Sequence, residues 1–161
     1  MAQHLVPIPA GMELGELPST SSWSVWHFVV ADCPCSSLLE EELLKSGAQD
    51  DLVEKVVRIG GNQSESELWN GRGFEFVAVT SDRAEQEYGV QGGPWLMVAR
   101  PDGSVLYSGG YSERLPNRAD DFLHRMIVER LISGEEVKLR PAFGCASATA
   151  LKSRIDPLGL K

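Results

Sequence analysis

The sequence predicts an α/β fold with a mixed central sheet and helices on both faces. The first observation is a run of aromatic and β-branched residues at 23–31, apolar on both of its faces, which is typical of a central parallel strand. The second is that strand patterns and helix patterns alternate after this run, as in parallel strands connected by helices. The third is a hairpin pattern followed by a final helix, which adds antiparallel strands to the sheet.

The first helix is expected at residues 36–45, soon after the first strand. Leucines recur there at helical spacing, Ser37 and Glu40 are placed as a capping box, and Gly47 follows the last turn. The next elements are a strand at 52–59, a short helix at 64–69 and a strand at 74–79.

The second half of the pattern contains the hairpin and two more helices. These elements are a helix at 82–88, strands at 95–100 and 104–107, and a long helix at 118–132. Asp82 is the expected N-cap of the first of these helices, and Gly134 ends the last. Pro101-Asp102-Gly103 joins the two strands, since proline fixes φ and glycine supplies a positive one.

A chain of 161 residues is expected to form one domain with one core. Residues 1–22 mix Pro, Gly and Ser with scattered apolar side chains and are expected to be an extended N-terminal segment. The folded domain is expected at 23–134. The C-terminal tail at 135–161 carries Cys145 but no convincing periodicity.

The charge of the chain limits its partners. A formal charge of −8 and a pI near 4.9 argue against nucleic acid and anionic membrane surfaces, both of which attract basic patches. Neither a signal peptide nor a membrane span is visible. We therefore expect a cytoplasmic protein if Met1 is the natural start, and a periplasmic or membrane-anchored one if the chain was shortened behind an anchor.

The three cysteines point to chemistry, because they are too few and too unevenly spaced for a disulfide scaffold. Cys33 and Cys35 lie where the first strand ends and the first helix begins. Backbone N–H groups and the helix dipole at that junction stabilise a thiolate, which is a better nucleophile than a thiol. The alternative is that both are small buried residues in a turn.

Several segments together resemble the thioredoxin superfamily. They are Asp32-Cys33-Pro34-Cys35-Ser36, the run from Tyr88 through Gly92-Gly93-Pro94 to Val98, Pro101-Asp102-Gly103 and Gly109-Gly110. The resemblance covers about 23–131, and the helix and strand between Ile59 and Val79 look like an insertion found in some branches. Within the superfamily, the Cys-Pro-Cys-Ser motif, the run 108–112 and Phe143-Gly144-Cys145 resemble bacterial RedB-type redox proteins.

The resemblance implies a thioredoxin-like fold and a thiol–disulfide oxidoreductase that acts on protein thiols or disulfides through Cys33 and Cys35, without a cofactor. It also implies that Pro94 is a cis-proline whose loop offers backbone groups to an extended substrate. The expected substrate-binding residues are therefore Pro34, Gly93 and Pro94. The sequence leaves the oligomeric state unassigned.

The motif departs from the superfamily because one residue, not two, separates its cysteines. A disulfide across one residue closes a tight ring, and the strain favours an oxidising or isomerising role. Alternatively, Cys145 is the resolving thiol for Cys33 or Cys35, or it is a small buried residue.

His27 lies six residues before Cys33, where thioredoxins carry a buried acid that moves protons. An imidazole there could accept a proton from a thiol, or it could be a packed histidine with a satisfied hydrogen bond. A second class of function is soft-metal binding or delivery. Cys33, Cys35 and Cys145 could hold Cu(I) or Zn(II), with His27 or His124 as a fourth ligand.

Overall fold

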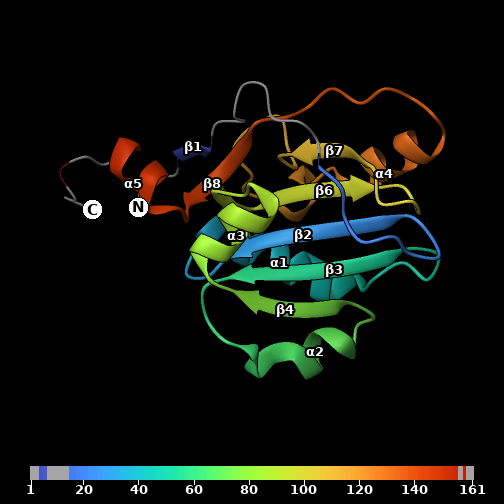
Figure 1. The fold of residues 1–161 in the computed structure, drawn as a ribbon, viewed down its shortest axis with the longest axis horizontal. Helices are drawn as coiled ribbons and strands as arrows, with labels where there is room; N and C mark the ends of the chain where they lie inside the picture. The colour runs from blue at the N-terminus through green and yellow to red at the C-terminus, as the bar shows by residue number, and fades with distance from the viewer. Residues whose placement is uncertain (1–3, 7–14, 156–157, 159–161) are drawn as a thin grey trace.

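The computed structural model describes residues 4–6, 15–155 and 158, and a five-stranded mixed sheet forms its centre (Figure 1). The sheet has the order β4-β3-β2-β6-β7. Its strands are β2 (Ser24–Val30), β3 (Val53–Ile59), β4 (Glu75–Val79), β6 (Trp95–Ala99) and β7 (Val105–Gly109). Strand β3 is parallel to β2 and to β4, whereas β6 is antiparallel to β2 and to β7. The predicted mixed sheet is confirmed.

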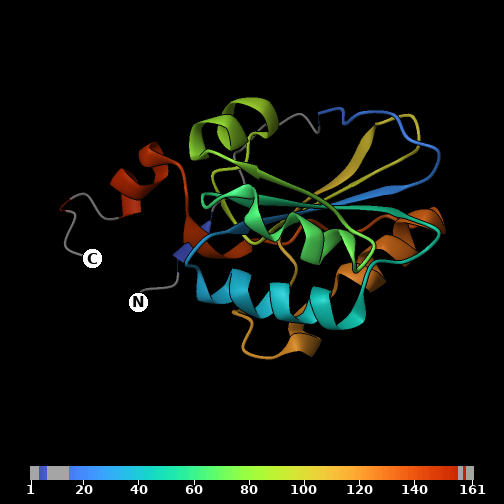
Figure 2. The same ribbon diagram turned by 90° about the horizontal axis from the view of Figure 1, so that it is seen from below.

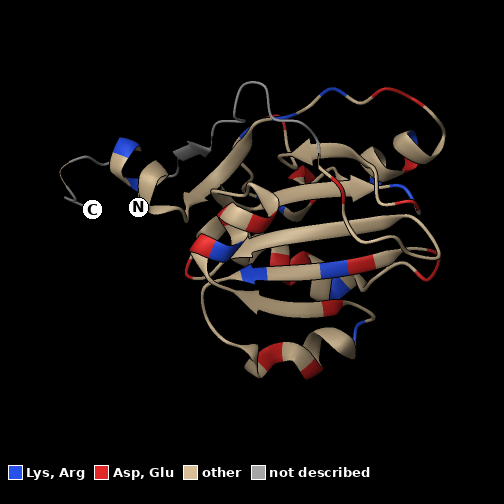
Figure 3. Cartoon of the chain, in the orientation of Figure 1, with Lys and Arg blue, Asp and Glu red and all other residues tan. Residues whose placement is uncertain are grey.

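Strand β2 is the central strand of the five, and every one of its residues is buried. Trp26, Phe28 and Val30 face one hydrophobic cluster, and Val25 and Val29 face the other. Figure 3 shows that β2, β6 and β7 carry no charged residues, whereas β3 carries both signs. A strand that is apolar on both faces must be covered on both faces, which is what the sequence pattern predicted.

Helices cover the two faces of the sheet (Figure 2). On one face lie α1 (Pro34–Ser46) and α4 (His124–Ile132), and on the other lies α3 (Ser81–Tyr88). Leu39 and Leu43 of α1 pack into the same cluster as Ile127 of α4, and Ala84 of α3 packs into the opposite one. This arrangement confirms the predicted α/β architecture.

The expected insertion follows β3 as a 3-10 turn, Gln63–Glu65, and a short helix, α2 (Ser66–Asn70). Trp69 of α2 is 1% exposed and stacks on Phe76 of β4, with Phe74 against its edge. This aromatic contact fixes α2 at the β4 edge of the sheet.

Two of the predicted helix caps are wrong. Helix α1 begins two residues earlier than expected, with Cys33 as its N-cap and Pro34 as its first residue. Proline is well tolerated at the first helical position, because the N–H that it lacks would have no partner within the helix. The Ser37–Glu40 capping box therefore lies inside the helix. The N-cap of α3 is Thr80, whose side chain accepts a hydrogen bond from the Arg83 N–H, and Asp82 lies within the first turn.

The helix predicted at 118–132 is divided. A 3-10 turn, Ala119–Asp121, is followed by α4, which begins at His124. Phe122 has an extended backbone, and its ring packs edge-on against Tyr111. Burial of this aromatic ring against the core takes precedence over helical continuity.

The tail contains elements that its sequence does not predict. They are β8 (Ala142–Ala146) and α5 (Thr149–Ile155). Strand β8 pairs antiparallel with β1 (His4–Val6) and with β5 (Gly92–Gly93), forming a second sheet of order β1-β8-β5. Of the N-terminal segment expected at 1–22, residues 1–3 and 7–14 lie outside the described part. No helix in the described part is long and apolar enough to cross a membrane.

Candidate active site

The first two cysteines lie at the junction between β2 and α1. Asp32 turns the chain with a φ of 58°, and Cys33 then takes an extended conformation as the N-cap. Pro34 and Cys35 are the first two residues of the helix. The first N–H groups of a helix carry partial positive charge, but the Cys33 side chain accepts no capping hydrogen bond from them. Both cysteines are buried, and Pro34 is exposed.

A second segment, residues 92–94, faces Cys33, and we call it the proline loop. The peptide bond between Gly93 and Pro94 is cis. The Cys33 thiol donates a hydrogen bond to the Gly93 carbonyl, with 3.7 Å between sulfur and oxygen. The backbone is closely packed at position 93, because an added Cβ would lie 3.0 Å from the carbonyl oxygen of Phe28. The fold thus brings Cys33 against Gly93, the residue that precedes Pro94.

Cys145 joins the same site from the tail. It lies on β8 directly opposite Gly93 in the β5–β8 ladder. Cys145 therefore lies close to Cys33, and Cys33 is one of the groups that raise the pKa of Cys145. All three cysteines are thiols in this structure. The sequence offered three explanations for Cys145, as a resolving thiol, a soft-metal ligand or a small buried residue, and the structure places it beside the Cys33 site.

Two of the thiols resist ionisation. Burial, followed by the influence of Cys33 and Cys35, raises the pKa of Cys145 to about 12, against a smaller opposing effect of Lys152. Burial, followed by the charge of Cys33, raises the pKa of Cys35 to about 11. At neutral pH both groups are protonated. Each would need a change in its surroundings before acting as a nucleophile.

The described residues contain no group of three or more His, Cys, Asp or Glu side chains arranged to hold a metal ion. The soft-metal alternative therefore receives no support from the side chains in this part of the chain.

Solved structures with a similar fold show which architecture this is. A hypothetical protein from Sinorhizobium meliloti matches with a TM-score of 0.66 and 19% identity, covering 93% of this chain and 100% of that one. An uncharacterised conserved protein from Geobacillus kaustophilus matches with a TM-score of 0.59 and 15% identity, over 92% and 96% of the two chains. A secreted disulfide oxidoreductase of Mycobacterium tuberculosis matches with a TM-score of 0.50 and 15% identity, over 71% of this chain and 83% of that one. The chain has the thioredoxin-like fold. No protein-family model matches the sequence, and no curated protein matches it.

In this thioredoxin-like fold, His27 lies in a network of its own. Its Nε2 lies 3.1 Å from a carboxylate oxygen of Glu54, and its Nδ1 lies 2.7 Å from the Tyr111 hydroxyl. In the tautomer that satisfies both contacts, His27 donates to Glu54 and accepts from Tyr111. His27 lies on the face of β2 that carries Val25 and Val29, whereas both early cysteines pack in the opposite cluster. The described hydrogen bonds of His27 thus reach β3 and Tyr111, and none reaches a cysteine.

His124 packs edge-on against His27, with 5.5 Å between the ring centroids. Burial, then the nearby His27 and Arg125, lower the pKa of His124 to about 3. Its Nδ1 is buried without a hydrogen-bond partner in the described structure. The neutral ring is therefore the form that the fold accommodates.

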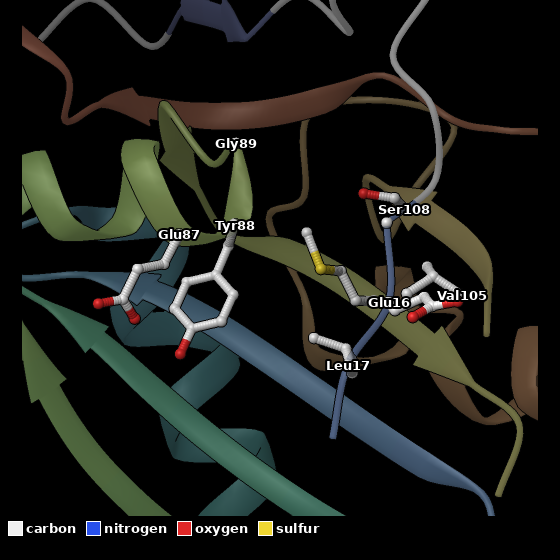
Figure 4. Close-up of a pocket in the computed structure, with 9 residues that line it drawn as sticks. Glu16, Leu17, Glu87, Tyr88, Gly89, Val105 and Ser108 are labelled. Carbon is white, nitrogen blue, oxygen red and sulfur yellow. The ribbon is translucent and has the colours of Figure 1, made fainter. Parts of the chain in front are cut away.

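A pocket of about 200 Å³ lies on the α3 face of the sheet, beneath residues 15–17 (Figure 4). Tyr88, Met97 and Ser108 line it together with the carboxylates Glu16 and Glu87. None of the three cysteines lines this pocket. The pocket and the cysteine site are therefore separate features of the molecule.

Two residues that shape the cysteine site were named in the sequence only as parts of motifs, without a role. Gly144 allows β8 to approach the proline loop, because an added Cβ would lie 1.9 Å from the Gly93 carbonyl oxygen. The side chain of Ser36 accepts a hydrogen bond from the Val30 N–H and so ties α1 to the end of β2. Both residues stand beside cysteines in the sequence, but their contacts come from segments that are distant from these motifs or precede them.

Proposed function

We propose that the protein is a thiol–disulfide oxidoreductase that acts through Cys33 and Cys35. The observation that carries this proposal is the contact between Cys33, at the N-terminus of α1, and the carbonyl of Gly93 in the proline loop. The contact joins the sulfur at the start of α1 to the backbone of the proline loop, whose outer edge is paired with β8. Such a site can stabilise a thiolate and position a partner disulfide.

The reaction follows from the position of Cys33. Its thiolate attacks one sulfur of a substrate disulfide, and the other substrate sulfur leaves as a thiol. A second cysteine of the protein then attacks the Cys33 sulfur, which releases the substrate as a dithiol and leaves the protein with a disulfide. The reverse sequence oxidises a dithiol substrate, so the direction depends on the partner.

The proposed substrates are protein thiols or disulfides, with contacts to Pro34, Gly93 and Pro94. Pro34 is exposed beside the buried sulfurs and so is available to a partner. The finer resemblance, to RedB-type redox proteins, belongs to this proposal and rests on the Cys-Pro-Cys-Ser motif and Phe143-Gly144-Cys145. His27 has no proton-transfer step in the proposal, because Glu54 and Tyr111 occupy both of its ring nitrogens.

The test is disulfide exchange by the purified protein on a model peptide disulfide. We expect Cys33→Ser to abolish exchange and Cys35→Ser to reduce it, while Ser37→Ala leaves the rate unchanged. Ser37 is a matched control because it lies in the same turn of α1 and is exposed. A wild-type protein without exchange activity that copurifies with stoichiometric copper or zinc would contradict the proposal.

A further inference from the structure

We propose that β8 occupies the backbone edge on which a substrate polypeptide docks, and that Cys145 is the thiol that resolves the mixed disulfide on Cys33. The inference rests on the proposed function and specifies which two sulfurs form the protein's disulfide. It also predicts that β8 leaves the proline loop when a substrate binds.

The first step concerns how a sulfur reaches Cys33. Strand β8 pairs with Gly92 and Gly93 in an antiparallel ladder, and the residue opposite Gly93 is Cys145. An extended chain that pairs with the proline loop therefore brings the side chain opposite Gly93 close to Cys33, and in β8 that side chain is the thiol of Cys145. A substrate segment that adds to the same edge would deliver its own sulfur in the same way, since strand addition supplies main-chain hydrogen bonds to any sequence.

The second step concerns access. Cys33 is 0% exposed while β8 is in place. A substrate disulfide therefore reaches the Cys33 sulfur only after a neighbouring segment moves, and β8, which is paired with Gly93, is the segment that the proposal displaces. Strand β8 belongs to the small β1-β8-β5 sheet, so its departure leaves the five-stranded sheet intact.

The third step concerns how β8 returns to the proline loop: hydrogen bonds and a buried side chain hold the chain on both sides of the strand. The Gly110 N–H donates to the Arg140 carbonyl before the strand, and the N–H groups of Ser147 and Ala148 donate to the Gln91 carbonyl after it. Leu151 of α5 is 2% exposed and holds the end of the tail in the core. Anchors on both sides keep Cys145 at a high effective concentration near Cys33.

Cys145 is better placed than Cys35 to resolve the mixed disulfide. It lies directly opposite Gly93, and the Gly93 carbonyl accepts the hydrogen bond of the Cys33 thiol. Cys35 is separated from Cys33 by Pro34 alone, in the first turn of a helix, where a disulfide would close a tight ring. In the resolving step the Cys145 thiol loses its proton and attacks the Cys33 sulfur. The Cys33–Cys145 bond forms, the bond to the substrate breaks, and the substrate sulfur takes up a proton as it leaves.

Peptide mapping distinguishes the two possible disulfides. Trypsin leaves Cys33 and Cys35 together in peptide 1–45 and Cys145 in peptide 139–152, since it does not cleave between Arg140 and Pro141. After one equivalent of a peptide disulfide, we expect the two peptides to be linked in the wild type and in Cys35→Ser, but not in Cys33→Ser. An oxidised but active wild type whose bond lies within peptide 1–45 would overturn the inference and leave the proposed function standing. A wild type without exchange activity would overturn both.

The displacement of β8 has its own test in the reduced protein. Gly144→Ala forces β8 away from the Gly93 carbonyl, so we expect alkylation of Cys33 by iodoacetamide to accelerate about tenfold or more. Gly15→Ala is the matched control, because an added Cβ there meets nothing within 4 Å. Equal alkylation rates in the two variants, with Gly144→Ala still folded by circular dichroism, would overturn the docking of β8 over Cys33.

Discussion

Acid should destabilise the protein through His124, and replacing this residue by leucine should remove that effect. His124 is 6% exposed, lies against His27 and Tyr111, and has an unpartnered Nδ1. Leucine has a similar volume and needs no hydrogen bond. We therefore expect His124→Leu to be close to the wild type in stability at pH 7, where the histidine is neutral.

The magnitude follows from the pKa of His124, which falls from 6.5 to about 3 on folding. Below pH 6.5 the unfolded chain binds a proton at this residue and the folded chain does not. The free energy of unfolding therefore decreases by about 1.4 kcal/mol for each pH unit between about 6.5 and 3. Above pH 6.5 His124 is neutral in both states and does not lower the free energy of unfolding, and the loss grows as the pH falls below 6.5.

Urea denaturation of both proteins at pH 7.0 and pH 4.5 measures this difference. Carboxylates titrate in both proteins, so the difference between them isolates His124. We expect the wild type to lose about 2.5 kcal/mol more than His124→Leu between the two pH values. Equal losses would refute the conclusion that the fold accommodates only the neutral ring.

Two further predictions concern the cap of α3 and the third thiol. Thr80→Ala removes the hydrogen bond from the Arg83 N–H and should lower the free energy of unfolding by about 1 kcal/mol. Asp82→Ala should lower it by only about 0.3–0.5 kcal/mol, because Asp82 acts through the helix dipole. Urea denaturation measures both values, and a larger loss in Asp82→Ala than in Thr80→Ala would contradict the prediction. The pKa of Cys145, raised from 9.0 to about 12, should slow its alkylation at pH 8 about 1,000-fold relative to the unfolded chain. Mass spectrometry of peptide 139–152 measures that rate, and equal rates in folded and unfolded protein would contradict the raised pKa.

The central sheet could be predicted from the sequence because its signal is local. Strand β2 is buried throughout, so its run of aromatic and β-branched residues is long and uninterrupted. The caps were harder because several polar residues near each helix start could accept the same hydrogen bond. At α3 both Thr80 and Asp82 were suitable, and the path of the chain after β4 selects Thr80.

Strand β8 could not be predicted because nothing local specifies it. Its residues, Ala142–Ala146, include Gly144 and lack a β-branched side chain. It is a strand because it pairs with β1 and with Gly92–Gly93, segments that are distant in the sequence. The closeness of Cys145 to Cys33 depends on these long-range pairs, so spacing alone could leave it only as an alternative.

His27 shows the same limit for the interpretation of single residues. Its spacing from Cys33 suggested proton transfer, but spacing says nothing about which groups reach the ring from other elements. Glu54 comes from β3 and Tyr111 follows β7, and together they occupy both nitrogens.

The central claim is that Cys33 is the sulfur that attacks the substrate, and single-cysteine proteins test it most directly. With Cys35 and Cys145 replaced by serine, nothing in the chain can resolve a mixed disulfide. We expect this protein to accumulate one covalently bound substrate sulfur, seen by intact mass, faster than the proteins that retain Cys35 alone or Cys145 alone. Equal or faster adduct formation by either of the other two proteins would contradict the claim.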